Sequence, residues 1–572
     1  MGVRRAMDMV LEEAMKKNGA IFTYGPLIHN PQVLEVLEGK GVRTLPEGTA
    51  ALSLPCPPRG TSVTVIIRAH GVSPDERQKI KDTGVRIINA TCPHVGKVQG
   101  IIKRYALKGY HIVIVGEKDH AEVMGLLGYA QGKGHVVNSL EALALLPSMD
   151  KVCLVAQTTQ DRNQFHTLAE AVQGKFPGAE IFNTICDSTH RRQDEALNLA
   201  RKVEAMVVVG GKASGNTRRL VKITEEAGVP SFHVETEKEL DLGALSRYSN
   251  IGVTAGASTP NWLILKVVER LRDVQKAKGI AYYSRKLARL ATISYLHLSI
   301  GAGCLTYASV LIQGLEPKVS WSLVAALYVF SMHVLNRLTD KPSERFNQPG
   351  RTEFYERYGN GMIAAGTFSA AVALILSWFR EGTLPFFLLL AISGLGMIYN
   401  IRVFPRRPGE MVRYRKLKDI PGSKTIFVAL AWGVVTSILP PLAQEGRLSW
   451  GTFVAFFFSV ILVFIRSTIY DFKDIQGDLI VGKETLPIVL GKRKSENLVV
   501  GLLFFLGGVL TAAPFLQWST TVTFFLLISL GYVVAYYSLY QEKILGKGFL
   551  FEGVVDGSFI FTGLLAFFWS IL

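Results

Sequence analysis

The sequence predicts two domains of different fold class: a soluble α/β domain at residues 1–280 and an all-α membrane domain of nine transmembrane helices at residues 281–572. In the first half, short β-rich runs alternate with helix-like stretches, which is the pattern of parallel sheets. In the second half, apolar runs about as long as a membrane is thick are separated by charged loops. A basic segment, residues 285–289, joins the two halves.

The first half contains seven segments with the composition of buried strands. They are residues 20–24, 63–67, 85–89, 111–115, 152–156, 205–209 and 251–254. A small or polar cluster follows each segment, and then a helix-like stretch follows the cluster. Residues 1–18 resemble a charged amphipathic helix rather than a cleavable signal peptide. Because parallel sheets bind their ligands at the carboxyl ends of strands, we expect a site built from the polar clusters.

These clusters carry histidine, cysteine, hydroxyl and amide side chains. The candidate site residues are His29, His70, Cys92, His120, Glu122, Thr158, Cys186, Ser214, Asn216, Thr217 and Ser258. Taken singly, each has an ordinary structural explanation as a polar residue at a strand end. Taken together, they indicate a site for a doubly charged anion beside a thiolate-bound metal centre. Cys153, inside an apolar run, is expected in the core, and Cys56 in a loop.

The second half contains nine apolar segments of about spanning length. They cover residues 290–312, 319–336, 361–379, 384–400, 424–441, 452–470, 498–516, 521–539 and 554–572. Lys and Arg concentrate in alternate loops, so the positive-inside rule places those loops and the first domain in the cytoplasm, and the C-terminus outside. This predicts a multi-pass protein of the cell inner membrane. The net charge of +17 is explained by this topology, and no clustered basic-aromatic face favours nucleic acid.

Two acidic clusters lie on the predicted cytoplasmic side. The second cluster, Asp471, Asp474 and Asp478, has the spacing of one helical face at the end of an apolar run. The first consists of Asn336, Asp340 and Glu344, again at helical spacing. Single acids beside a membrane are commonly solvated loop charges. Clustered like charges at the mouth of a membrane helix favour a bound cation, and Mg²⁺ with a substrate diphosphate is the natural occupant.

Residues 285–572 resemble the UbiA-type intramembrane prenyltransferases. The second Asp-rich motif is intact and continues as Gly-Lys-Glu-Thr-Leu-Pro at residues 482–487. The first motif departs from the family's pattern, since Arg337 replaces an acid and Glu344 replaces the last Asp. By resemblance, phosphate-contacting loop residues are Tyr399, Arg402, Lys418 and Lys424. The resemblance implies Mg²⁺-dependent transfer of a prenyl group from a prenyl diphosphate to a membrane acceptor, with Asp471 and Asp474 as catalytic residues; transfer of a phosphoribosyl group or attack by an alcohol is the alternative.

Residues 1–275 resemble the 4-hydroxy-3-methylbut-2-enyl diphosphate reductases, because the strand-end motifs occur in the family's order. The resemblance implies three α/β subdomains around a central 4Fe–4S cluster, with Cys92 and Cys186 as ligands. The three histidines, Ser214, Asn216, Thr217 and Ser258 would contact the substrate diphosphate, while Glu122 and Thr158 would bind the hydroxyl and deliver protons. Electrons from a ferredoxin or flavodoxin would then yield isopentenyl and dimethylallyl diphosphate.

One departure from the reductase pattern concerns the first cluster cysteine. The family carries it in a Gly-Phe-Cys-x-Gly-Val run, whereas this sequence begins Met1-Gly2-Val3. Either translation starts upstream and the cysteine is present, which we favour, or the domain is degenerate. The corresponding functional hypotheses are a bifunctional isoprenoid enzyme and a membrane prenyltransferase with an inactive reductase-like scaffold. A transporter or lipid-binding protein is a third hypothesis, and the retained aspartates argue against it.

Overall fold

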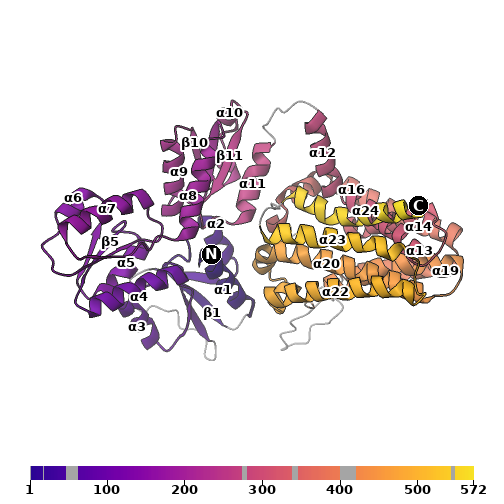
Figure 1. The fold of residues 1–572 in the computed structure, drawn as a ribbon, viewed down its shortest axis with the longest axis horizontal. Helices are drawn as coiled ribbons and strands as arrows, with labels where there is room; N and C mark the ends of the chain where they lie inside the picture. The colour runs from indigo at the N-terminus through magenta and orange to yellow at the C-terminus, as the bar shows by residue number, and fades with distance from the viewer. Residues whose placement is uncertain are drawn as a thin grey trace. The chain divides into compact units, whose positions relative to one another are not determined.

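A computed structural model describes residues 2–16, 19–46, 62–272, 280–337, 345–399, 420, 422–542 and 548–572. The chain divides into two compact units, Met1–Lys276 and Ala277–Leu572 (Figure 1). The first is α/β and the second is helical, so the predicted order of fold classes is confirmed. The boundary at residue 280 stays a prediction, as does the placement of the two units relative to a membrane.

The first unit contains three separate sheets in which every paired strand is parallel. The first sheet has the order β2 (Val42–Leu45), β1 (Ala20–Tyr24), β3 (Val63–Ile67) and β4 (Arg86–Asn89). The second has the order β6 (Gly134–Val137), β5 (His111–Val115), β7 (Val152–Ala156) and β8 (Glu180–Ile181). The third has the order β10 (Ser231–Val234), β9 (Ala205–Val209) and β11 (Ile251–Ala255). All seven predicted strands are present.

The sequence did not indicate four strands, β2, β6, β8 and β10. Each lies at the edge of its sheet, has four residues or fewer, and is only partly buried. A strand that is buried on both faces needs a continuous apolar run, whereas an edge strand does not. The central strands β5, β7 and β9 are buried almost throughout and were therefore visible in the sequence. Cys153 lies in β7 and is fully buried, as expected.

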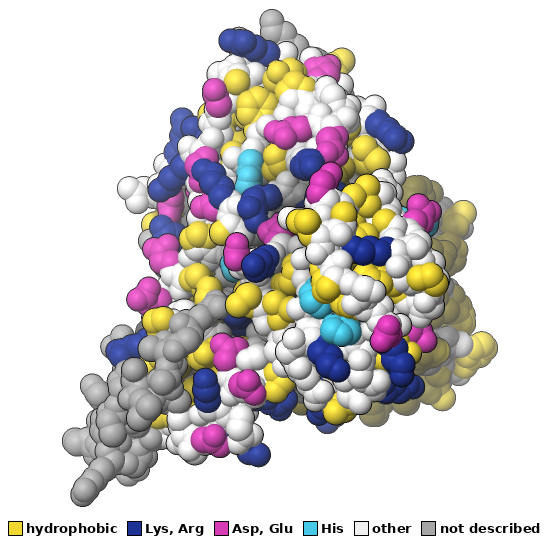
Figure 2. Space-filling view, turned by 90° about the vertical axis from the view of Figure 1, so that its left-hand side faces the viewer, with side chains coloured by type: hydrophobic (Ala, Val, Ile, Leu, Met, Phe, Trp, Pro, Cys, Tyr) yellow, Lys and Arg dark blue, Asp and Glu magenta, His cyan; other side chains and the backbone are white. Residues whose placement is uncertain are grey.

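Helices connect these strands and begin close to the strand ends. They are α1 (Gly2–Lys16), α2 (Pro31–Glu38), α3 (Pro74–Asp82), α4 (Pro93–Leu107), α5 (Ala121–Leu127), α6 (Leu140–Ala144), α7 (Arg162–Lys175), α8 (Asp187–Ala200), α9 (Gly215–Glu226), α10 (Leu242–Leu245) and α11 (Asn261–Arg272). The predicted amphipathic N-terminal helix corresponds to α1. Lys/Arg and Asp/Glu side chains are interspersed over the face of the first unit that Figure 2 shows.

The second unit is a bundle of apolar helices. They are α12 (Ile280–Ile293), α13 (Leu296–Ile312), α14 (Val319–Arg337), α16 (Pro349–Leu376), α17 (Thr383–Ile398), α18 (Ser423–Gly433), α19 (Leu439–Gln444), α20 (Trp450–Val481), α21 (Leu486–Val489), α22 (Lys492–Phe515), α23 (Val522–Gln541) and α24 (Phe549–Ile571). Single π-helical turns continue α16 to Glu381 and join α18 to α19. Phe458, Phe551 and Phe559 are fully buried in its core, whereas Phe504 and Phe515 are more than three-quarters exposed. Exposed aromatic side chains of this kind suit a lipid environment.

The count of nine transmembrane helices is not confirmed. Within the described residues, seven helices are long and apolar enough to cross a membrane, or eight if α12 and α13, which meet at a bend of 71°, form one span. The predicted segment at residues 384–400 corresponds to α17, which has only 16 residues. At 1.5 Å per residue such a helix is about 24 Å long, shorter than the roughly 30 Å hydrocarbon core.

Candidate functional sites

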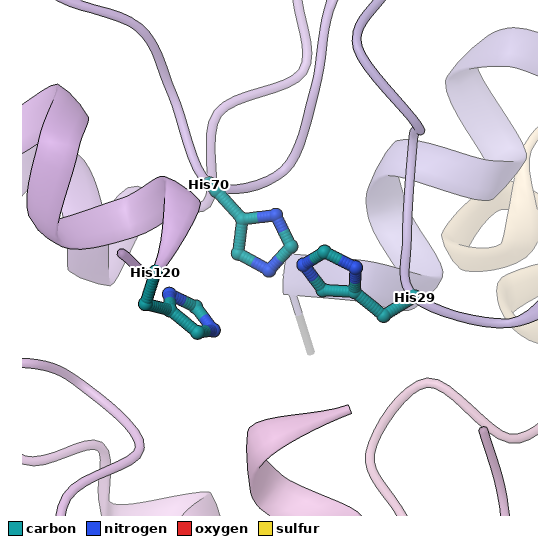
Figure 3. A group of neighbouring side chains, drawn as sticks. All are labelled: His29, His70 and His120. Carbon is teal, nitrogen blue, oxygen red and sulfur yellow. The ribbon is translucent and has the colours of Figure 1, made fainter. Parts of the chain in front are cut away.

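The three predicted histidines lie together in the first unit. His29 follows β1, His70 follows β3 and His120 follows β5, so the strand ends of two different sheets supply them. Their rings converge, as Figure 3 shows, with ring centroids 4.8 to 5.8 Å apart. One nitrogen of each lies within 4.8 Å of those of the other two. This half-buried group can donate several hydrogen bonds to one anion, or hold a metal ion.

The protonation of His120 is set by its position at the start of α5. Its Nδ1 accepts a hydrogen bond of 3.2 Å from the backbone N–H of Glu122, so the proton of the neutral ring is on Nε2. Burial, together with His29 and nearby arginines, lowers the pKa of His120 to about 4. Burial, with His29 and His120, also holds the pKa of His70 well below its usual range. Both imidazoles are therefore neutral donors at neutral pH.

The third sheet reaches the same cluster through the loop after β9. A Cβ on Gly215 would lie 3.6 Å from His120 Nε2, and Gly211 packs against the backbone of His29. Ser214 caps α9 by accepting a hydrogen bond from Thr217 N. Both amide atoms of Asn216 and the hydroxyls of Thr217 and Ser258 are buried without a hydrogen-bond partner.

Such orphaned polar atoms are costly unless a ligand satisfies them. They share the unit with the imidazole donors, and the first turn of α9, which carries Asn216 and Thr217, begins at Gly215 beside His120. A site that receives an anion with many acceptor oxygens, such as a diphosphate, explains both observations.

Glu122 and Thr158 form a second, buried pair. Glu122 is 1% exposed and accepts two hydrogen bonds, from Thr158 N at 2.7 Å and from Thr158 Oγ1 at 2.9 Å. Burial raises the pKa of Glu122 to about 7, although the two hydrogen bonds oppose that effect. A carboxyl with a pKa near the working pH can both hold and release a proton. The pair adjoins the imidazoles, since Glu122 lies two residues after His120.

Cys92 and Cys186 both sit at helix N-termini. Cys92 precedes α4 and Cys186 precedes α8, and neither side chain caps its helix. Both are half-buried free thiols. The start of α1 packs so closely on Cys92 that a Cβ on Gly2 would overlap with its Sγ. Cys186 N donates to the carbonyl of Thr158 at 2.9 Å, so this cysteine adjoins the Glu122–Thr158 pair.

These thiols are suitable donors for an iron–sulfur cluster, because cysteine sulfur is its usual ligand and neither thiol is engaged in a disulfide. They fit two of its ligand positions. Among the described residues, Cys92 and Cys186 do not form one group with a further Cys, His or acidic side chain at ligand distance. The group whose side chains do lie that close together consists of the three histidines.

The second candidate site is on α20, in the helical unit. Asp471, Asp474 and Asp478 lie in the last three turns of this continuous helix, as their spacing predicted. Thr425 Oγ1 donates to Asp471 Oδ2 at 3.1 Å, and Asn347 Nδ2 donates to Asp478 Oδ1 at 3.1 Å. Asp478 is only 4% exposed. Three carboxylates on one helix, two of them oriented by hydrogen-bonding neighbours, fit Mg²⁺, which prefers oxygen ligands.

The other predicted residues of this site are only partly described. Asn336 is half-buried in the last turn of α14, and Lys424 lies in the first turn of α18, beside Thr425. Lys424 and Lys483 are both within electrostatic range of Asp471 and Asp478. Tyr399 shares a hydrogen bond of 2.8 Å with Ser423. Asp340, Glu344, Arg402 and Lys418 lie outside the described residues.

The sequence did not indicate Asn347 or Thr425, because an isolated amide or hydroxyl carries no motif. One signal was present. Gly477 lies directly before Asp478 inside α20, near the end of the helix, where glycine is still less favourable than other residues. Its position is explained by Asn347, whose side chain would overlap with a Cβ on residue 477.

We expect Gly477→Ala to displace Asn347 and to raise the Mg²⁺ concentration needed for half-maximal activity by about tenfold, as is typical when a ligand loses its hydrogen-bond partner. The matched control is Gly501→Ala on α22, where a Cβ meets nothing within 4 Å. A Mg²⁺ titration of both variants tests this, and equal requirements in the two would contradict it.

The fold and the two sites define a two-part protein: an α/β domain that presents imidazoles and thiols, and a helical domain with candidate membrane spans that presents carboxylates. Comparisons with known proteins agree. Residues 1–272 match the model of the LytB protein family, and residues 296–547 match that of the UbiA prenyltransferase family.

The chain belongs to the LytB family of 4-hydroxy-3-methylbut-2-enyl diphosphate reductases, and the region that matches the UbiA model follows the LytB region in the sequence. The reductase of that name from Geobacter sulfurreducens is 46% identical over 282 residues, covering 48% of this chain and 95% of the relative. A solved (E)-4-hydroxy-3-methyl-but-2-enyl diphosphate reductase is 37% identical, covering 48% of this chain and 95% of that one, with a TM-score of 0.37. A UbiA homolog from Archaeoglobus fulgidus, solved with DMAPP and Mg²⁺, is 15% identical, covering 50% of this chain and all of that one, with a TM-score of 0.35.

Proposed function

We propose that the chain is a bifunctional enzyme that reductively dehydroxylates 4-hydroxy-3-methylbut-2-enyl diphosphate and also transfers a prenyl group from a prenyl diphosphate to a membrane acceptor. The observation that carries the reductase proposal is the buried Glu122–Thr158 pair beside three converging imidazoles. One part of the site suits the diphosphate end of such a substrate. The other part suits its hydroxyl, which must receive a proton before it leaves as water.

In the reductase site, His29, His70 and His120 would donate hydrogen bonds to the diphosphate, and the orphaned atoms of Asn216, Thr217 and Ser258 would complete its binding. A bound iron–sulfur cluster, held by Cys92 and Cys186 among its ligands, would supply two electrons from a donor such as ferredoxin or flavodoxin. Thr158 Oγ1 would orient the substrate hydroxyl, and Glu122 would hold the proton that the departing oxygen takes up. The carbon–oxygen bond breaks, water leaves, and a second proton from the medium adds to the allylic carbon, so that two electrons and two protons are consumed for each substrate. Burial of both side chains excludes bulk water from the proton path.

The neutral imidazoles predict a pH-dependent affinity for diphosphate. A bound anion favours the imidazolium form, so the complex takes up a proton that the free site, with His120 at a pKa of about 4, does not hold. Affinity for inorganic diphosphate is therefore expected to rise as the pH falls from 7 to 5, by up to about tenfold per pH unit for each histidine that gains a proton.

Isothermal titration of the purified protein in buffers of different ionisation enthalpy measures this proton uptake. His120→Asn should flatten the dependence. His166→Gln, which changes an exposed histidine beside Glu170, should leave it intact. An affinity that stays constant between pH 7 and pH 5 would contradict the proposed role of the imidazoles.

In the membrane site, Asp471, Asp474 and Asp478, with Asn336, would hold Mg²⁺, and Lys424 would face the diphosphate. Bound Mg²⁺ would neutralise the charge that develops on the leaving diphosphate. The carbon–oxygen bond to the prenyl group breaks, the diphosphate departs with the bonding electrons, and the acceptor supplies the electron pair of the new bond and loses a proton. Thr425 and Asn347 orient two of the carboxylates and do not contact the substrate.

The direct test uses the full-length protein, purified without oxygen in detergent. We expect bound iron and sulfide, reduction of 4-hydroxy-3-methylbut-2-enyl diphosphate by a chemical reductant, and separate Mg²⁺-dependent release of diphosphate from a prenyl diphosphate in the presence of native lipid extract. If the protein transfers prenyl groups but contains no bound iron, the first domain is an inactive reductase-like scaffold. Fractionation of the native host should place the protein in the inner membrane, with its first domain accessible from the cytoplasm.

A further inference from the structure

The helix that carries the three aspartates presents cations on another face. Arg466 and Lys473 are seven residues apart on α20, which brings them to the same side of the helix after two turns. Lys473 directly precedes Asp474 in the sequence, but its side chain is rotated about 100° around the helix axis from that of Asp474. Both cations are almost fully buried, with side chains 11% and 3% exposed.

Two acids on α24 hold these cations. Glu552 accepts from Lys473 Nζ at 2.8 Å through one carboxylate oxygen and from Arg351 Nη2 at 2.6 Å through the other. Asp556, one turn further along α24, accepts from Arg466 Nε at 2.8 Å. The Tyr470 hydroxyl also reaches the carbonyl of Glu552, at 3.5 Å. These contacts join α16, α20 and α24 by charge pairs that are hidden from solvent.

Glu552 has a competitor for the Lys473 ammonium. That ammonium is within electrostatic range of Asp474 as well. An ammonium that pairs with Asp474 would occupy a carboxylate on which a divalent cation depends. Salt and water screen buried charges much less than exposed ones, so this attraction is strong. Arg466 lies about two turns before Asp474, so the Asp556 pair carries no such competition.

We propose that Glu552 is a positioning residue of the Mg²⁺ site: it holds Lys473 on the α24 side of the helix and thereby keeps Asp474 available to the metal ion. This inference rests on the proposed Mg²⁺-dependent function of the carboxylates. It assigns to Glu552 no contact with substrate. Its effect on metal binding passes through Lys473.

Equilibrium binding of Mn²⁺, followed by the electron paramagnetic resonance signal of the free ion, tests this without an activity assay. Binding to the carboxylate site is the part lost in Asp474→Asn, which subtracts any Mn²⁺ held by the histidines. We expect Glu552→Gln to weaken this binding by about tenfold. Asp556→Asn, which breaks an equally buried pair on the same helix, should change it by less than about twofold, although both variants unfold at lower temperature.

A second change separates competition from structural damage. Removing the competing ammonium in Glu552→Gln/Lys473→Met should restore Mn²⁺ affinity to within about threefold of the unaltered protein. Lys473→Met alone, in which Glu552 keeps Arg351, should bind Mn²⁺ at least as tightly as the unaltered protein; it decides the question if Glu552→Gln does not fold.

The failures are distinguishable. Equal affinities in Glu552→Gln and the unaltered protein, no restoration in the double variant, or weaker binding in Lys473→Met would overturn the role of Glu552 alone. Mn²⁺ binding that is the same in Asp474→Asn and in the unaltered protein would overturn the proposed metal site, and the role of Glu552 with it.

Discussion

Glu122→Gln should lower the rate of reductive dehydroxylation by roughly two to four orders of magnitude, the usual contribution of a positioned proton donor. The amide keeps the shape of the carboxyl: its oxygen can still accept from Thr158 N, and its NH2 group can donate to Thr158 Oγ1 in place of the bond that the carboxylate accepted. It cannot give up a proton at neutral pH. Substrate affinity should change little, because the diphosphate contacts lie on other residues. Single-turnover assays with a chemical reductant separate the rate from the affinity.

The same residue sets an expected pH dependence. With a pKa of about 7, Glu122 holds its proton below pH 7 and loses it above, so the rate should fall as the pH rises through 7. The contribution of Glu122 to stability has the same sign: between pH 4.5 and 7 the unfolded chain gives up this proton while the folded chain keeps it, so this contribution to the free energy of unfolding decreases as the pH rises. The lowered pKa values of His70 and His120 give the opposite slope below about pH 6.5. Glu122→Gln should remove the fall in rate above pH 7 and the Glu122 contribution to stability, and leave that of the histidines.

Glu13→Gln is the matched control, since Glu13 is a buried glutamate of the same domain that pairs with Arg86 and Lys16. It should reduce thermal stability and leave the single-turnover rate within about twofold. A pH-rate profile that is unchanged in Glu122→Gln would remove this residue from the proton path.

Asp474→Asn should lower prenyl transfer by about three orders of magnitude, comparable to the loss of a major electrostatic contribution to a transition state. The central aspartate of the α20 cluster has no neutral substitute, since an amide is a far weaker ligand for Mg²⁺ than a carboxylate. Iron content and dehydroxylation activity should stay unchanged, because that chemistry is assigned to the other compact unit. Release of diphosphate from a prenyl diphosphate is the measurement.

Glu445→Gln serves as its control. Glu445 follows α19 and pairs with Arg447. The hydrogen-bond partner of Asp471, Thr425, lies instead at the beginning of α18. This variant should transfer prenyl groups at the normal rate. Full transfer activity in Asp474→Asn would point instead to a lipid-binding or transport role for the membrane domain.

Most of the fold could be predicted from the sequence, because the central strands and the long helices correspond to continuous apolar segments. β5, β7 and β9 are buried on both faces and could hardly be missed, whereas β8, a two-residue edge strand, leaves no pattern. The helical count was less certain for a physical reason. Hydropathy identifies apolar segments, but whether α17, with 16 residues, crosses a membrane depends on length and on its neighbours.

The same division holds for the candidate sites. Histidines, cysteines and regularly spaced aspartates can be recognised in a sequence, because clusters of these residues are rarely required for folding alone. The residues that orient them do not. Asn347 reaches Asp478 from 131 positions away, and Glu552 reaches Lys473 from 79 positions away. Such long-range partners are set by the packing of helices, which no local spacing encodes. Gly477, a residue type that is unfavourable inside a helix, was the one local sign of such a partner.

The unbroken length of α20 has a consequence for how a substrate with a long hydrocarbon chain would enter the site. Its 32 residues span about 48 Å, well beyond the roughly 30 Å of a hydrocarbon core. Asp471 lies 21 residues after Trp450, about 31 Å along the axis, so the carboxylates come level with the lipid headgroups when Trp450 sits at the opposite surface. A prenyl diphosphate dissolved in the bilayer holds its own charged end at that depth. Substrate would then enter sideways without leaving the membrane, and bilayers made from longer acyl chains should slow the reaction by submerging the carboxylates.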